Sequence, residues 1–237
     1  MRGCLFTLLL GAVALVLIVV VGLPQVAAGL LTTAVGAAGL QADDTTVTVS
    51  SDPPTDLVGL HADRVRIRAT SATFRGLAIG ALDVELHDVS LIDRSARGID
   101  GRMTDVIVPN VGGRSLRLDA ITLGGGGETV TAATLVAGTD AERLIADAIE
   151  TKTGVRPKVS LGAPDRLVVD VGVSLEGTLD VNAAGDLVVV IADNPVVTGD
   201  IVLLRAGEDL PIRLTGVGVM PGGDLQLTGE LAIGILR

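Results

Sequence analysis

The chain has two histidines, His61 and His87, and a Ser-His-Asp triad would have to use one of them as its general base. His87 is followed by Asp88 and by Ser90, which are the residue types of a nucleophile–base–acid triad. Neighbouring residues of a strand point to opposite faces, so a triad here would need a bulge and a serine from elsewhere. His61 stands near Asp63, and no G-x-S-x-G elbow is present. We therefore predict no catalytic residues and keep hydrolysis as an alternative.

Three arginines could bind phosphate. Arg64, Arg66 and Arg68 alternate with apolar residues, so that they share one face of a predicted strand over residues 64–69. Guanidinium groups in such a row can bind phosphate through paired hydrogen bonds. The alternative is structural, because Asp83 and Glu85 would form cross-strand ion pairs with them if residues 82–87 were the neighbouring strand.

Metal, nucleotide and nucleic-acid binding are not indicated. Two histidines and the single cysteine, Cys4, cannot form an ordinary zinc site from nitrogen and sulfur ligands. The glycine run at 124–127 is followed by Glu128 and lacks the lysine and serine of a P-loop. The net charge of -10 opposes binding to nucleic acid. We expect no metal and no cofactor.

The first residues are strongly apolar. After Arg2, no charged residue occurs before Asp43, and residues 4–23 match the ~20 apolar residues that cross a bilayer. The positive-inside rule then places the N-terminus in the cytoplasm and the rest outside it, as in a single-pass protein of the cell membrane. The alternative is a cleaved signal peptide, since residues 26–28 have the small-x-small form of a cleavage site.

Two further segments have helical patterns. Residues 24–40 begin with a proline and are apolar nearly all round, so this helix must be covered by lipid or by a sheet. Residues 139–154 have a predicted capping box of Thr139 and Glu142 and a stop at Gly154. The apolar stripe of the second helix includes Leu144, Ile145 and Ile149.

Most of the remaining chain alternates between strands and turns. Before the second helix, the predicted strands are 46–50, 64–69, 82–91, 115–123 and 129–137. After it, they are 166–181, 186–192, 200–204, 211–219 and 224–233. Short turns between strands predict an antiparallel meander. The predicted fold class is α+β, with a strongly coiled antiparallel sheet packed on two helices and preceded by one transmembrane helix. The predicted parts are an anchor at 1–23, an apolar helix at 24–42 and a domain at 43–237.

Three of these strands change the parity of their apolar residues. Leu82, Val84 and Leu86 share one face in the first strand, whereas Val89 has the opposite parity. The same change occurs within 115–123 and within 211–219. A β-bulge adds one residue, bends the strand and re-aims the side chains that follow, so repeated bulges predict a coiled sheet around a groove. The alternative is that the changes mark strand ends.

The order of an apolar helix and these strands resembles the LmeA-like phospholipid-binding proteins of bacterial cell envelopes. The stretches that carry the resemblance are residues 53–69, residues 80–89 and the helix at 139–154, and the most similar text lies within 45–110. The resemblance implies a tubular lipid-binding (TULIP-like) fold that holds the acyl chains of a phospholipid. For some relatives it also implies a lipase activity, without a catalytic motif that matches positions of this chain.

The expected function is therefore that of an extracytoplasmic phospholipid-binding protein anchored by residues 4–23. Val, Leu, Ile and Ala must build any groove, because the chain has no Trp or Tyr and two Phe residues. The residues predicted to line it are Leu144, Ile145, Ile149, Leu82, Val84, Leu86 and Phe74, and the head-group candidates are Arg64, Arg66 and Arg68. The expected partner is a phospholipid or another acyl lipid. The alternatives are a lipid hydrolase and a structural protein with a closed core.

Overall fold

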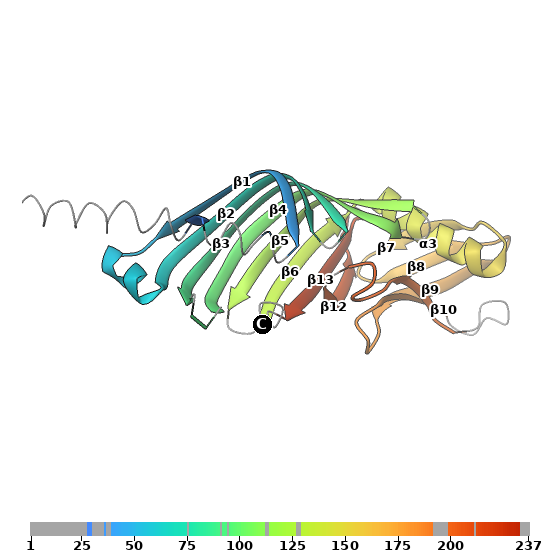
Figure 1. Ribbon diagram of the computed structural model, residues 1–237. Coiled ribbons are helices and arrows are strands. Elements are labelled where there is room, and N and C mark those ends of the chain that lie inside the picture. Colours follow the sequence, from blue (N-terminus) through green and yellow to red (C-terminus); the bar gives the residue numbers. More distant parts are fainter. Residues whose placement is uncertain are drawn as a thin grey trace, which may run out of the picture.

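The computed structural model describes residues 28–29, 36, 39–74, 76–90, 92–93, 95–111, 114–126, 129–191, 199–210 and 212–232. These residues form an elongated molecule with two antiparallel sheets (Figure 1). The long strands of the first sheet occupy one end, and the second sheet with helix α3 (Gly138–Thr153) occupies the other.

The first sheet has eight strands and is curved along its strands (Figure 1). Its order is β1-β2-β3-β4-β5-β6-β13-β12, so that the last two strands of the chain pair onto the first six. Short turns connect most of these strands, and the 3-10 helix η2 (Pro54–Gly59) lies between β1 and β2. The strands are β1 (Leu40–Ser50), β2 (His61–Phe74), β3 (Leu77–Ser90), β4 (Ser95–Val111), β5 (Arg114–Gly126), β6 (Thr129–Val136), β12 (Arg213–Val219) and β13 (Leu225–Ala232).

The second sheet has five shorter strands in the order β11-β10-β9-β8-β7. Two backbone hydrogen bonds join it to β12, because the N–H of Leu214 donates to the carbonyl of Gly185 and that of Val219 to the carbonyl of Pro164. The two sheets therefore share one core. The strands are β7 (Lys158–Gly162), β8 (Arg166–Asp170), β9 (Ser174–Val181), β10 (Leu187–Ile191) and β11 (Ile201–Leu204).

Helix α3 packs its apolar stripe into the main core beside β7 and β11. The helix ends at Gly154, whose φ of 75° fits the left-handed C-cap that glycine favours. The predicted capping box is wrong, because the N-cap residue is Ala137, whose side chain makes no capping hydrogen bond. Instead, the N–H of Gly138 donates to the Asp224 carboxylate at 3.0 Å, which connects the helix to the turn before β13.

The predicted α+β class is wrong, because strands make up 67% of the structure and the described part contains one long helix. The predicted anchor at 4–23 and almost all of the predicted helix at 24–42 lie outside the described residues. Among the residues that are described, no helix is both long and apolar enough to cross a membrane. The predicted transmembrane helix, and the cell-membrane localisation that was predicted with it, are therefore not borne out among the described residues.

The prediction omitted two strands of the structure, and one predicted strand forms two separate strands. The unpredicted strands are β4, which lies in the middle of the long sheet, and β7. Glycines at 98 and 101 and a proline at 109 dilute the alternating pattern of β4, although they do not interrupt it. The predicted strand 166–181 divides at Gly172, where φ is 91° and the chain turns back on itself to pair β8 with β9.

A single row of residues interrupts the pairing of five strands, and we call this row the crease. It consists of Asp43, Ser71, Gly80, Asp105 and Asp119, one from each of β1 to β5. Alternate members have a left-handed backbone, since φ is 49° at Ser71 and 51° at Asp105. A residue in this region turns the chain, so the alternation of side chains restarts with the other parity.

The buried residues on either side of the crease show this change of parity. In β2, the core residue Ala69 is followed by Ala72, and in β5, Leu118 is followed by Ile121. All four belong to the same core cluster, so the crease keeps the apolar side chains on one side of the sheet. The parity change predicted in β5 is therefore real. The change predicted in β3 occurs away from the crease, at Asp88, where Leu86 and Val89 on either side pack in the same cluster.

The predicted cause of these changes is correct for one strand of the three. The register of β2, β3 and β4 is the same on both sides of Asp88, whose φ is 49°, and the register of β4 and β5 is unchanged at the crease. At these positions the two residues that face each other on neighbouring strands are both unpaired. Neither strand therefore has an extra residue. The pairing of β12 with β13 does shift between Leu214 and Gly216, as a bulge requires.

Candidate functional site

One side of the long sheet has a continuous block of uncharged side chains, which we call the aliphatic face. The register places three residues from each of six strands in this block, across about 24 Å at 4.8 Å per strand. They are Thr45, Val47 and Val49; Val65, Ile67 and Ala69; Leu82, Val84 and Leu86; Ile99, Gly101 and Met103; Ile121, Leu123 and Gly125; and Val130, Ala132 and Thr134.

Both ends of the aliphatic face are packed, and its middle is partly open. At one end it joins the main core below α3. At the other end, Val49 and Val65 pack with Leu57 of η2, and Ala28 contacts the same cluster. Around the buried Val84, seven apolar side chains that pack against these clusters or lie between them are half-buried rather than buried. These are Val47, Ile67, Leu82, Leu86, Ile99, Met103 and Leu123. The molecule therefore has accessible aliphatic surface along a line that crosses several strands.

The other side of the same strands is charged, and we call it the charged face. Its ionisable members are Asp44, Arg64, Arg66, Arg68, Asp83, Glu85, His87, Asp100 and Arg102. Arg66 forms two hydrogen bonds with Asp83, at 2.8 and 2.7 Å. Arg68 approaches Asp83 at 3.3 Å, and Arg64 pairs with Glu85 at 2.7 Å. The three arginines therefore form the predicted cross-strand ion pairs.

The Arg66–Asp83 pair keeps both partners ionised. The hydrogen bond from Arg66 lowers the pKa of the Asp83 carboxyl below its ordinary value, and the charge of Arg66 adds to this effect. The same bond raises the pKa of Arg66. Both side chains remain substantially exposed, so the pair fixes the side chains on this face and contributes little to stability.

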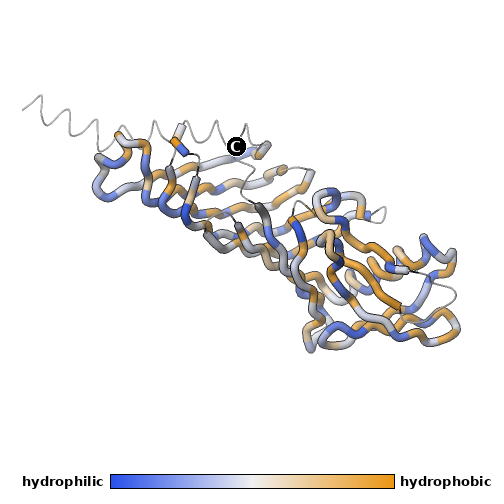
Figure 2. Tube along the Cα trace, turned by 90° about the horizontal axis from the view of Figure 1, so that it is seen from below, coloured by the Kyte–Doolittle hydropathy of each residue, from blue (hydrophilic) through white to orange (hydrophobic). Residues whose placement is uncertain are grey.

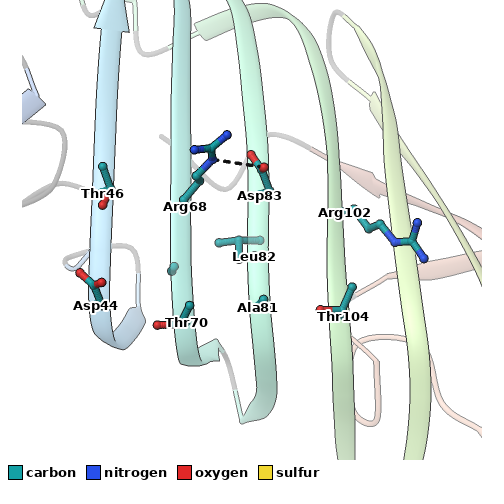
Figure 3. A pocket seen from close by; sticks show the side chains of 10 residues that line it. Asp44, Thr46, Arg68, Thr70, Ala81, Leu82, Asp83, Arg102 and Thr104 are labelled. Atoms are coloured by element: carbon teal, nitrogen blue, oxygen red, sulfur yellow. Dashed lines mark hydrogen bonds and ion pairs between the residues drawn. The ribbon is translucent and has the colours of Figure 1, made fainter.

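A hollow of about 420 Å³ lies on the charged face beside the crease. In Figure 3, Arg68 points toward Asp83, whereas the guanidinium of Arg102 points away over the neighbouring strand. The hollow thus contains charges of both signs and three threonine hydroxyls. Its lining residues are Asp44, Thr46, Arg68, Ala69, Thr70, Ala81, Leu82, Asp83, Arg102 and Thr104.

The two sets of predicted site residues are separated by the sheet. Leu82, Val84 and Leu86 lie on the aliphatic face, and Arg64, Arg66 and Arg68 lie on the charged face. Figure 2 shows the underlying pattern, in which hydrophobic and hydrophilic residues follow each other along the long strands. One lipid molecule could not place its acyl chains on the first set and its head group on the second without passing around an edge of the sheet.

The other predicted groove residues lie elsewhere. Leu144, Ile145 and Ile149 of α3 are buried in the main core, and Ile145 is fully inaccessible to solvent. Phe74 lies beyond the crease, at the far end of β2, where it packs against the same core. These four residues therefore contribute to the packing of the molecule, and the structure does not bring them to the open part of the aliphatic face.

His61, His87 and Ser90 do not make the serine–histidine contact that a catalytic triad requires. The hydroxyl of Ser90 donates to the Asp93 carboxylate at 2.8 Å, although His61 lies directly across the sheet from Ser90. The Nδ1 atom of His61 is 2.9 Å from the carbonyl oxygen of Gly59. His87 is 3.2 Å from Asp100 on the charged face. No hydrogen bond joins a serine to a histidine within the described ranges.

Several residues of the aliphatic face were not predicted. Ile99 and Met103 were missed because β4 was missed, and Leu123 was assigned to a strand without a role. The signal was present as Ile99-x-Gly101-x-Met103, in which glycine takes the place of an apolar side chain. Gly101 is needed there, because a Cβ atom would come within 2.8 Å of the Val84 side chain on the neighbouring strand.

The fold and the site define a mostly β protein with two antiparallel sheets, the longer of which has one aliphatic and one charged face. Comparisons of the chain with protein-family models, with curated proteins and with solved structures return no match.

Proposed function

We propose that this protein binds an acyl lipid, such as a phospholipid, on the aliphatic face of the long sheet. The observation that supports this most directly is the half-buried middle of that face. Proteins seldom leave a long row of aliphatic side chains partly open to water without a function, since covering apolar surface is favourable. An acyl chain is the simplest molecule that matches a surface with this length and without charge.

Affinity would come from apolar burial rather than from specific polar contacts. Each methylene group that leaves water contributes about 0.8 kcal/mol, so about ten of them supply a gross ~8 kcal/mol. Part of this is lost to the ordering of lipid and protein. Because Leu, Ile, Val and Met side chains provide the contacts, binding would depend on chain length more than on the identity of the head group.

The resemblance to LmeA-like phospholipid-binding proteins supports the same proposal. The most similar text, residues 45–110, includes most of β1, all of β2 and β3, and nearly all of β4. These strands supply half or more of the aliphatic face. The lipid-hydrolase alternative has less support, because Ser90, which faces His61 across two strands, donates its hydrogen bond to Asp93 instead.

Native mass spectrometry of the full chain tests the proposal. We expect phospholipid to co-purify at close to one molecule per chain, or to bind after incubation with phosphatidylcholine vesicles. Leu123→Glu would place a charge on the aliphatic face and should abolish binding. Thr122→Glu is the matched control, since Thr122 is the neighbouring residue on the opposite, exposed face of β5.

The outcomes are distinct. Equal binding by the two variants would show that the lipid lies elsewhere, and an unchanged lipid-free mass for the original chain would reject lipid binding. In the latter case the aliphatic face would serve as a structural surface, as in the closed-core alternative.

A further inference from the structure

The long sheet has an open edge at β1. In the strand order, β1 comes first, and among the strands that the structure describes it pairs with β2 alone (Figure 1). Edge strands that must remain single are commonly protected by charged side chains, by proline or by being very short. β1 is 11 residues long and contains no proline, and its two charges, Asp43 and Asp44, precede an uncharged segment at 45–50. Its outer N–H and C=O groups can therefore pair with another strand.

We propose that β1 pairs antiparallel with β1 of a second copy of this chain, about a two-fold axis at Val47. The pairing would use residues 44–50, because the crease interrupts the alternation at Asp43. In this register, Val47 faces Val47 of the second copy, and Thr45 faces Val49. Each residue meets one from the same side of the sheet, so the aliphatic faces of the two copies become one continuous surface.

The charges along this edge are complementary to themselves under such a two-fold axis. Asp44 is exposed at one end of the paired segment, on the charged face. At the other end, Ser50 lies beside Arg64, whose side chain pairs with Glu85 of its own copy at 2.7 Å and is still 60% exposed to a further carboxylate. The axis places Asp44 of one copy next to Ser50 of the other. Asp44 and Arg64 then stand two strand spacings apart, about 10 Å between backbones, which their side chains together can span.

A parallel pairing would lose this match, because it would put like ends of the segment side by side. Asp44 would then lie beside the acidic end of the second copy. The two-fold arrangement also creates the charge pair twice, as an isologous interface requires. The charges therefore select the antiparallel register over the parallel one.

Cysteine cross-linking in the full chain tests the register, with Cys4→Ser as the background. Val47→Cys should form a disulfide-linked dimer under copper-catalysed oxidation, since facing residues of paired strands are close enough. Thr45→Cys is the matched control, because its two copies would be about 14 Å apart, four residues along the strand. A mixture of the Thr45→Cys and Val49→Cys chains should again cross-link, as mixed dimers. Failure of Val47→Cys, or equal cross-linking by Thr45→Cys, would overturn the register.

Charge reversal tests the interface without cross-linking. Asp44→Arg should weaken the dimer by roughly tenfold, measured as the dissociation constant by sedimentation, because two ion pairs become repulsive. Arg64→Asp should weaken it similarly, and the double variant should restore it. Asp180→Arg makes the same change in net charge at an exposed position of β9, in the second sheet and away from the edge, and should leave the dimer unchanged. A monomer at all concentrations, or a dimer that tolerates both single reversals, would reject this interface.

Discussion

Two regions of the molecule are built from the same residue types and differ in what covers them. The stripe of α3 and the middle of the aliphatic face both consist of leucine, isoleucine and similar side chains. Those of α3 pack into the main core beside β7 and β11 and are buried. Those of the aliphatic face have neighbours within their own sheet and remain half-buried. Aliphatic composition therefore marks both a core and a candidate binding surface, and the second layer decides between them.

The largest expected effect is in α3. Ile145→Ala should reduce the free energy of unfolding by about 2–5 kcal/mol, because the side chain is fully buried and its loss leaves a cavity. Chemical denaturation measures this directly. A loss below 1 kcal/mol would mean that the helix packs loosely, and the contrast between the two regions would disappear.

The second-largest loss of stability is expected for a substitution in the crease. A Cβ atom at Gly80 would lie 2.8 Å from the Cβ of Asp105, so Gly80→Val should cost on the order of 2 kcal/mol by forcing neighbouring strands apart. Gly222→Ala is the control, since a Cβ atom there meets nothing within 4 Å. Thermal unfolding of both variants should separate them clearly. Equal melting temperatures would show that the strands adjust freely at the crease.

A smaller change in stability is expected on the aliphatic face. Leu82→Ala should cost about 1 kcal/mol, well below Ile145→Ala, because part of the side chain is already exposed. The same variant should lower the amount of bound lipid measured by mass spectrometry. If Leu82→Ala were as destabilising as Ile145→Ala, this part of the sheet would be core, and the lipid proposal would lose its main support.

The charged face should give the smallest effect. Asp83→Asn removes an exposed ion pair, so the melting temperature at pH 7 should fall by at most about 2–4 °C. Because the pKa of Asp83 is lowered in the folded state, its contribution is present above the ordinary value of 3.8 and is lost as the pH falls through the folded value. The difference between the two proteins should therefore shrink as the pH is lowered from 7 toward 3. A difference that stays constant would contradict this origin.

The sequence predicted local features well where one pattern determines one structure. The helix at 139–154, the antiparallel strands and the ion pairs of Arg64, Arg66 and Arg68 all follow from periodicity and spacing. The predicted fold class was wrong because strands make up 67% of the structure and the described part contains one long helix. The order of the strands was also beyond local patterns. Pairing of β13 with β6 depends on contacts between residues about 95 positions apart, which no local pattern encodes.

The candidate site was harder to predict for a related reason. Alternation identified Leu82, Val84 and Leu86 as one face of a strand, and this was sufficient to place them on the aliphatic face. The helical spacing of α3 likewise indicated one apolar surface, although that surface is buried in the structure. Whether an apolar surface is covered depends on the tertiary partner, so Leu144, Ile145 and Ile149 could not be distinguished from groove residues by sequence.

The crease has a consequence for how the chain finds its native pairing. In an ordinary alternating sheet, a slip of two residues keeps every side chain on its own face and is weakly opposed. Here the alternation restarts at one row in five strands. A strand that slipped by two would restart out of step with its neighbours and would bury polar groups beside the core. The row from Asp43 to Asp119 thus helps to set the register of the strands during folding. It raises the free energy of misaligned pairings in which the burial of apolar side chains would otherwise be unchanged.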